Sequence, residues 1–175
     1  MQDFFTDEKI NQSAFIDVSD MPFTEKAASY CKANLCGRYG RSWSCPPAVG
    51  DFNTLKARAL TFDKAFVFSH KGDIESFSDE KAMDSLRDET MEILFSFCKK
   101  LKEKNISHLA LGCGSCNFCK KCTYPDSPCP YPEKAIPPVE AYGVDVSALC
   151  EKTGMTYMAE NNEVTFFCII FFKNK

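Results

Sequence analysis

The stretch VTFFCIIFF, residues 164–172, decides the fold. Its side chains are apolar at nearly every position rather than at every second one. Strict alternation is typical of a strand with one face in solvent, whereas a continuous apolar run favours a strand that is covered on both faces. We therefore expect 164–172 to be a central strand of a sheet.

Upstream segments supply the partners of this strand. Residues 155–159 predict a strand joined to it by a hairpin around Asn161-Asn162. Farther back, a strand over 63–69 is followed by a helix that starts at Ser78 or Asp79 and ends near Lys104, and by a strand over 106–111. This order implies a right-handed crossover with the two strands paired in parallel. The apolar stripe that defines the helix consists of Met83, Leu86, Thr90, Ile93, Leu94, Phe97, Cys98 and Leu101.

Shorter elements complete the chain. Residues 11–19 predict a strand, and Thr24, Asp51 and Asp145 are typical caps for three more helices. A length of 175 residues fits one domain, 1–175. The sequence thus predicts an α/β (α+β) fold, with helices packed on a mixed sheet of about five strands. Two cysteine-rich loops, 31–50 and 112–138, are expected to form a metal-cluster subregion.

The composition of the chain limits which binding partners and which cellular compartment are expected. The formal net charge of −3 gives no electrostatic reason to expect nucleic acid. The longest apolar run is too short to span a bilayer, so no membrane partner is expected. The N-terminal segment MQDFFTDEKINQ lacks the basic and apolar regions of a signal peptide, which favours the cytoplasm. Eleven cysteines in a reducing compartment indicate metal or redox chemistry rather than disulfides. The sequence does not indicate an oligomeric state.

The eleven cysteines fall into two classes. Cys98 lies on the apolar helix stripe, Cys150 on the face of a short helix, and Cys168 inside the central strand, so all three are expected in the core. The remaining eight occur in or beside loops rich in glycine and proline. These candidate metal ligands are Cys31, Cys36, Cys45, Cys113, Cys116, Cys119, Cys122 and Cys129.

Eight thiolates match two [4Fe–4S] clusters, which take four each. The segment CGSCNFCKKC, residues 113–122, repeats a gap of two residues, as iron–sulfur sequences do. Structural zinc is the less favoured alternative, because its ligands usually come as two separated pairs. The first loop is one thiolate short of a cluster and the second has one too many. Which thiolate belongs to which cluster stays open: Cys45 or Cys129 could be the remote fourth ligand for Cys113, Cys116 and Cys119. The simplest closure lends one thiolate of the second loop, Cys122 or Cys129, to the first.

Residues beside the cysteines suggest how a cluster would be held. Arg38 and Arg41 could offset the negative charge of a thiolate-ligated cluster. Gly37 and Gly114 would let backbone N–H groups approach the inorganic sulfides closely. For each arginine, a solvated turn is an equally good interpretation.

Two groups of motifs carry a resemblance to a known family. They are C-x₄-C-G-x-Y with W-x-C-P-P-x-x-G, over 31–50, and L-G-C-G-x-C-x₂-C-x₂-C with P-C-x-x-P and E-A-Y-G-V-D-V, over 111–146. This pattern resembles a family of predicted metal-binding proteins of anaerobic bacteria and archaea. The resemblance implies a metal-binding protein but supplies no reaction, and it gives Glu140 and Tyr142 no role.

Three functions fit the sequence. The first is a small iron–sulfur protein that exchanges single electrons with an unidentified redox partner. The second is an enzyme with substrate at an open iron or a reductive site, in a pocket that contains Arg38, Arg41, His70 or Glu140. The third is a zinc-stabilised interaction module. No phosphate-binding loop, dinucleotide fingerprint or nucleophile triad is present, which disfavours nucleotide use and acyl transfer.

Overall fold

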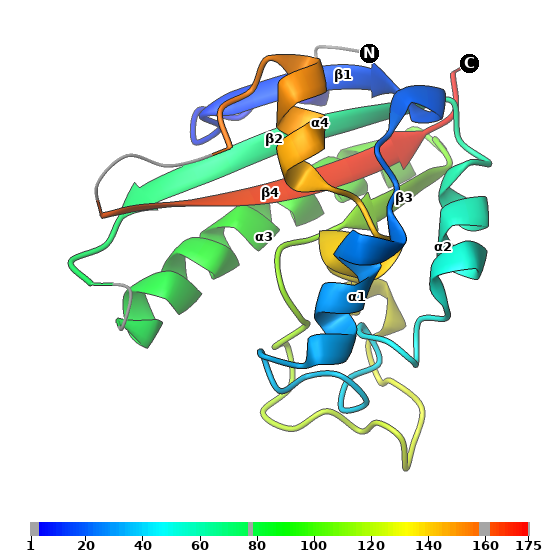
Figure 1. Cartoon of the computed structure of the whole chain (residues 1–175), viewed down its shortest axis with the longest axis vertical. Helices are drawn as coiled ribbons and strands as arrows, with labels where there is room; N and C mark the ends of the chain where they lie inside the picture. The colour runs from blue at the N-terminus through cyan, green and yellow to red at the C-terminus, as the bar shows by residue number, and fades with distance from the viewer. Residues whose placement is uncertain (1–3, 77–78, 158–161, 175) are drawn as a thin grey trace.

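The computed structural model describes residues 4–76, 79–157 and 162–174. The described strands form one antiparallel sheet in the order β1-β2-β4-β3 (Figure 1). Their bounds are β1 Gln12–Asp17, β2 Lys64–Asp73, β3 His108–Leu111 and β4 Glu163–Phe172.

β4 is a central strand, as its sequence predicts. It pairs with β2 along its whole length and with β3 at its C-terminal end. Its side chains alternate between two separate hydrophobic clusters, one on each face of the sheet. Phe167, Ile169 and Phe171 belong to one cluster and Cys168, Ile170 and Phe172 to the other. The continuous apolar run of β4 therefore reflects burial of the strand on both faces of the sheet.

The predicted parallel pairing of the strands at 63–69 and 106–111 is wrong. β2 and β3 run in the same direction, but β4 lies between them and is antiparallel to both. The chain forms a split β-α-β unit, in which the last strand fills the gap left by the crossover. The sheet is accordingly antiparallel rather than mixed.

Four strands rather than about five are seen in the described parts of the chain. Residues 155–157 of the predicted strand 155–159 are not in a strand. Residues 158 and 159, and Asn161 of the predicted hairpin, lie outside the described residues. Asn162 has a positive φ of 44° immediately before β4, a conformation that asparagine adopts in turns.

One long helix covers one face of the sheet. α3 spans Glu80–Glu103, and Asp79 caps it by accepting from the backbone N–H groups of Lys81 and Ala82. Its apolar stripe packs on the sheet as predicted (Figure 1). The buried residues of α3 are Leu86, Thr90, Ile93, Leu94, Phe97 and Leu101. Among the described helices, none is long and apolar enough to cross a membrane.

The remaining helices are shorter, and most of them lie on the opposite face. The α-helices are α1 Glu25–Ala33, α2 Phe52–Ala59 and α4 Val146–Thr153, and the 3-10 helices are η2 Val18–Asp20, η3 Pro132–Lys134 and η4 Val139–Tyr142. The predicted caps are confirmed: Thr24, Asp51 and Asp145 each accept a hydrogen bond from a backbone N–H in the first turn. α2, α4 and η4 contribute to the core on this face, and α1 packs against η4.

A glycine allows α1 and η4 to approach closely. Gly143 ends η4 with a φ of 69°. A Cβ at this position would lie 2.5 Å from a ring carbon of Phe52 and 2.7 Å from the backbone oxygen of Thr24. The Thr24 backbone N–H also donates to the Gly143 oxygen at 2.7 Å. Only glycine fits this backbone conformation in so little space, so the start of α1 is fixed to the end of η4.

Both cysteine-rich loops lie at the same end of the molecule. The loop after α1 and the loop after β3 extend side by side away from the sheet (Figure 1). The base of the second loop is closed by backbone hydrogen bonds from Gly112 to Pro137 and from Val139 to Gly112. These bonds place η4 beside the end of β3, directly under the two loops.

Candidate metal centre

The two cysteine loops are bonded to each other, as the sequence predicts. The backbone N–H of Cys116 donates to Ser44 Oγ at 2.9 Å. The indole N–H of Trp43 donates to the Ser127 oxygen at 3.0 Å and to Thr123 Oγ1 at 3.2 Å. Three contacts between side chains of the first loop and groups of the second therefore hold the loops together.

Four thiols gather on the second loop. Burial raises the pKa of the Cys116 thiol, and the nearby thiols of Cys129, Cys119 and Cys122 raise it further. These neighbours act in the same direction as burial, because a thiolate is destabilised by neighbouring negative charge. We call Cys116, Cys119, Cys122 and Cys129 the second thiol group.

Cys122 has donors from both loops. Burial raises the pKa of its thiol, but hydrogen bonds outweigh this effect and the pKa is lowered. The donors are the backbone N–H groups of Tyr124, Trp43 and Thr123 and the hydroxyl of Ser42. Hydrogen bonds to sulfur stabilise the thiolate, which is the form that binds metal.

Three further thiols gather at the end of α1. The pKa of the Cys31 thiol is raised to about 12. Burial is the largest cause, and the carboxylate of Glu140 and the thiols of Cys45 and Cys36 raise the pKa further. Burial also raises the pKa of Cys45, against hydrogen bonds from Ser44 and Ser42 that lower it. We call Cys31, Cys36 and Cys45 the first thiol group. Glu140 is their acidic neighbour.

The first thiol group lines a cavity of about 500 Å³. Cys113 and Glu140 line the same cavity, and the other walls include apolar side chains such as Tyr39, Val139 and Phe166. The cavity lies where α1, η4 and the end of β3 meet. It is large enough to hold a small molecule.

Cys113 differs from the other seven candidate ligands. It belongs to the cluster of buried residues under α3 and is only 7% exposed. Its Sγ lies 3.9 Å from the backbone oxygen of Arg87, and after burial it is the main cause of the raised pKa of the fully buried Cys168. Cys113 thus lines the cavity wall while its thiol bonds to groups of the core.

A buried pair of serines links the two thiol groups. Ser42 and Ser44 are 2% and 0% exposed, and their Oγ atoms lie 3.0 Å apart. Ser44 Oγ also lies 3.8 Å from Cys45 Sγ, while Ser42 donates to Cys122. The sequence interpretation overlooked both serines. The pattern S-W-S-C directly before a ligand candidate was the available signal.

The non-cysteine candidates are placed as follows. Arg38 is exposed, and its charge lowers the pKa of Cys45 against the larger effect of burial. Arg41 is exposed. Gly37 and Gly114 have φ values of 67° and 77°. Residues with a side chain rarely adopt this left-handed backbone conformation, so glycine is favoured at both turns.

The three cysteines assigned to the core lie there. Cys150 and Cys168 are 2% and 0% exposed, and Cys98 packs partly buried against the cluster under α3. No hydrogen bond joins Cys98 or Cys150 to either thiol group within the described part of the chain.

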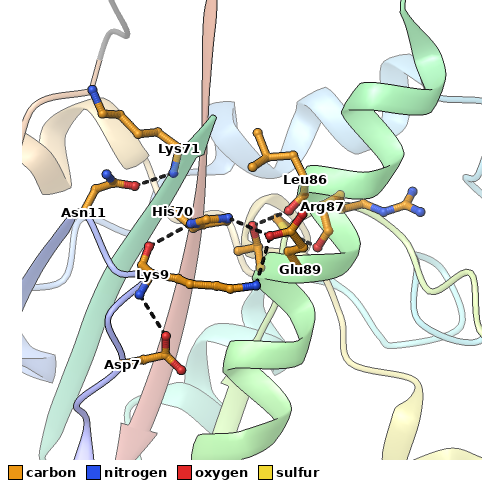
Figure 2. A network of polar contacts seen from close by, with 10 residues as sticks. Asp7, Lys9, Asn11, His70, Lys71, Leu86, Arg87 and Glu89 are labelled. Atoms are coloured by element: carbon orange, nitrogen blue, oxygen red, sulfur yellow. Dashed lines mark hydrogen bonds and ion pairs between the residues drawn. The ribbon is translucent and has the colours of Figure 1, made fainter. Parts of the chain in front are cut away.

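His70 lies in a different environment from the thiols. Its Nδ1 lies 2.8 Å from the backbone oxygen of Lys9, and its Nε2 lies 3.8 Å from the Glu89 carboxylate (Figure 2). Lys9 Nζ lies 3.1 Å from the same carboxylate. His70 therefore joins the N-terminal segment to α3. These contacts indicate a structural role for His70, and they include no candidate metal ligand of either thiol group.

Among the described residues, no three His, Cys, Asp or Glu side chains converge closely enough to hold one metal ion. A single tetrahedral zinc requires thiolate sulfurs about 3.8 Å apart, given a Zn–S distance of about 2.3 Å. The thiols of each group would have to move closer together to bind one zinc.

Comparison with curated proteins and with solved structures finds no match. A family model does match, over residues 14–172, and its description is "Predicted metal-binding protein (DUF2284)". This match covers all eight loop cysteines and confirms the resemblance to a predicted metal-binding family. The chain belongs to the DUF2284 family of predicted metal-binding proteins.

Proposed function

We propose that this protein binds two [4Fe–4S] clusters and exchanges single electrons with a redox partner in the cytoplasm. The observation that carries the proposal is the gathering of seven loop thiols into two groups on loops that are bonded to each other. The second thiol group would supply all four ligands of one cluster. The first would supply three ligands of the other, and Cys113 is the remaining thiol on its cavity wall.

The surroundings of the thiols suit this role. Cubane clusters are tuned by hydrogen bonds to sulfur and by burial. Here backbone N–H groups and Ser42 donate to Cys122, while Ser44 contacts Cys45. Contacts of the buried serine pair support a short distance between the two proposed centres, which would favour electron transfer between them.

A second candidate function is a cluster-dependent enzyme. The cavity favours it, because Glu140 and three thiols share about 500 Å³ with apolar walls. A carboxyl group in a pocket beside a cluster could take up or release protons during a reaction. The enzyme would use the same two clusters, with the first at the substrate pocket.

A reductive titration tests the electron-transfer proposal. Anaerobically purified protein is titrated with dithionite while visible absorbance and electron paramagnetic resonance are recorded. The proposal predicts reversible uptake of about two electrons per chain, one for each cluster. A colourless protein that takes up no electrons and contains stoichiometric zinc would contradict it and favour the zinc-stabilised interaction module.

A further inference from the structure

A second cavity lies at the open edge of the sheet. β3 is an edge strand, and its residues His108, Leu109 and Ala110 form one wall of a space of about 580 Å³. The other walls come from α2, from η4 and from both cysteine loops. This volume is in the range of cavities that bind small molecules.

One buried polar group on the wall of this cavity has no partner. Tyr142, the last residue of η4, is 0% exposed, and its hydroxyl has no hydrogen-bond partner among the described residues. Nearly all buried polar groups in folded proteins have a partner, because burial without one is unfavourable. The fold therefore places a hydroxyl donor in the cavity wall and provides no acceptor for it.

Arg58 of α2 lines the same cavity. Burial raises the pKa of the Tyr142 hydroxyl, and the nearby charge of the Arg58 guanidinium lowers it. Within the described ranges, no carboxylate lies at ion-pair distance from Arg58. The guanidinium and the hydroxyl are thus neighbouring donors that both lack an acceptor. A carboxylate suits this pair, because it can accept two N–H bonds from an arginine and a further O–H bond from a tyrosine.

The remaining walls limit the kind of acid. Most of them are apolar, and they include Trp43, Val49, Leu109, Ile136 and Pro137. Apolar walls favour a ligand with an apolar body beside its acid group. The exposed carboxylate of Glu133 also lines the cavity, and its negative charge disfavours a doubly charged ligand such as phosphate. The lining therefore favours a monocarboxylate.

We propose that this cavity binds a small monocarboxylic acid with an apolar body, whose carboxylate accepts hydrogen bonds from Arg58 and from the Tyr142 hydroxyl. Neither donor is a candidate metal ligand, so the inference goes beyond the proposed iron–sulfur function and does not rest on it. Cys129 of the second thiol group lines the same cavity. A bound acid would therefore lie beside that group.

Titration of anaerobically purified, full-length protein with butyrate and with benzoate tests the site. Trp43 is the single tryptophan of the chain and lines the cavity, so its emission reports binding there. The thermal unfolding midpoint is a second readout, because a ligand that binds only the folded protein raises it. We expect saturable binding of at least one acid at millimolar concentration. Butyramide and benzamide, which lack the negative charge, should give no saturable response.

Two substitutions test the two donors separately. Arg58→Gln should weaken binding of the acid by about tenfold or more. Lys56→Gln is the matched control, since it removes a positive charge from the same helix at a residue that does not line the cavity. Tyr142→Phe should weaken binding by about 3–10-fold through loss of one hydrogen bond. Without the acid, Tyr142→Phe should unfold at the wild-type temperature or above it, because the hydroxyl that it removes has no partner among the described residues.

Four results would overturn the inference. The first is no saturable binding of either acid, and the second is equal binding by the Arg58→Gln and Lys56→Gln variants. The third is a lower unfolding temperature of Tyr142→Phe in the absence of acid, which would mean that the hydroxyl stabilises the fold. The fourth is tighter binding of inorganic phosphate than of either acid. None of these results bears on iron or sulfide content, so the proposed function is tested independently.

Discussion

Ser44 Oγ accepts a 2.9 Å hydrogen bond from the backbone N–H of Cys116, and this bond joins the two cysteine loops at their centre. Ser44 is completely buried and also contacts Ser42 and Cys45. One hydroxyl group therefore touches residues next to both candidate metal centres. The position explains why a small polar residue is buried in an otherwise irregular region.

Ser44→Ala should destabilise the protein by about 1–3 kcal/mol, because the N–H of Cys116 loses its partner in a water-poor site. The matched control is Ser29→Ala, whose exposed hydroxyl donates only to the Lys26 oxygen in α1. This control should change stability by less than about 0.5 kcal/mol. Anaerobic denaturant unfolding of the metal-loaded protein measures both. Equal stability of the two variants would show that the bond does not hold the loops.

Gly143→Ala should be much more harmful than Gly154→Ala. Both glycines have positive φ, 69° and 72°, so each alanine costs about 1–2 kcal/mol of backbone strain. A Cβ at Gly154 meets nothing within 4 Å, whereas at Gly143 it overlaps Phe52 and the Thr24 oxygen. We expect Gly143→Ala to cost about 1–3 kcal/mol more than the control and to lower metal content at the first thiol group. Thermal unfolding and iron analysis check this, and similar values for both variants would argue against a rigid junction.

Cys45→Ala should loosen the second loop as well as its own. The side chains of Ser42, Trp43 and Ser44 reach the second loop, and all three lie just before Cys45. Loss of the first metal centre would free this segment and with it residues 113–129, since metal binding and folding are coupled in such sites. Hydrogen exchange should show faster exchange in both loops. Normal protection throughout 111–130 would mean that the loops bind metal independently.

The core cysteines should be dispensable for metal. Cys98→Ala, Cys150→Ala and Cys168→Ala each remove a packed sulfur from the core, at a stability cost of about 0.5–3 kcal/mol. Iron and sulfide content should equal the wild-type values in all three. Loss of a whole cluster from Cys150→Ala would show that the division into core cysteines and metal-binding cysteines is wrong.

Much of the fold could be predicted from local patterns. The continuous apolar run of β4 predicts its central position, and the stripe on α3 predicts which residues are buried. The sequence also predicts the helix caps Thr24, Asp51, Asp79 and Asp145, because a cap bonds to a backbone N–H only two or three residues away. Local patterns do not predict which strands pair with β2 and β3. β4 is the last strand in the chain and lies between them, and strand order depends on contacts between distant parts of the sequence.

The candidate site shows the same division. The spacing of the loop cysteines marks them as candidate ligands, and the number of thiols on each loop suggests that the loops share ligands. The thiols of Cys122 and Cys129 both affect the pKa of Cys116, and Cys122 is also affected by Trp43 and Ser42 of the first loop, so which of the two is lent to the first loop stays a prediction. The proximity of Glu140 to Cys31 depends on the packing of η4 against α1 through Gly143. Such a contact between distant parts of the sequence has no local pattern.

The most direct test of the account is the iron and acid-labile sulfide content of anaerobically purified protein. Two [4Fe–4S] clusters predict about eight irons and eight sulfides per chain. About four of each would show one cluster and surplus thiols. Stoichiometric zinc with no sulfide would contradict the iron–sulfur account.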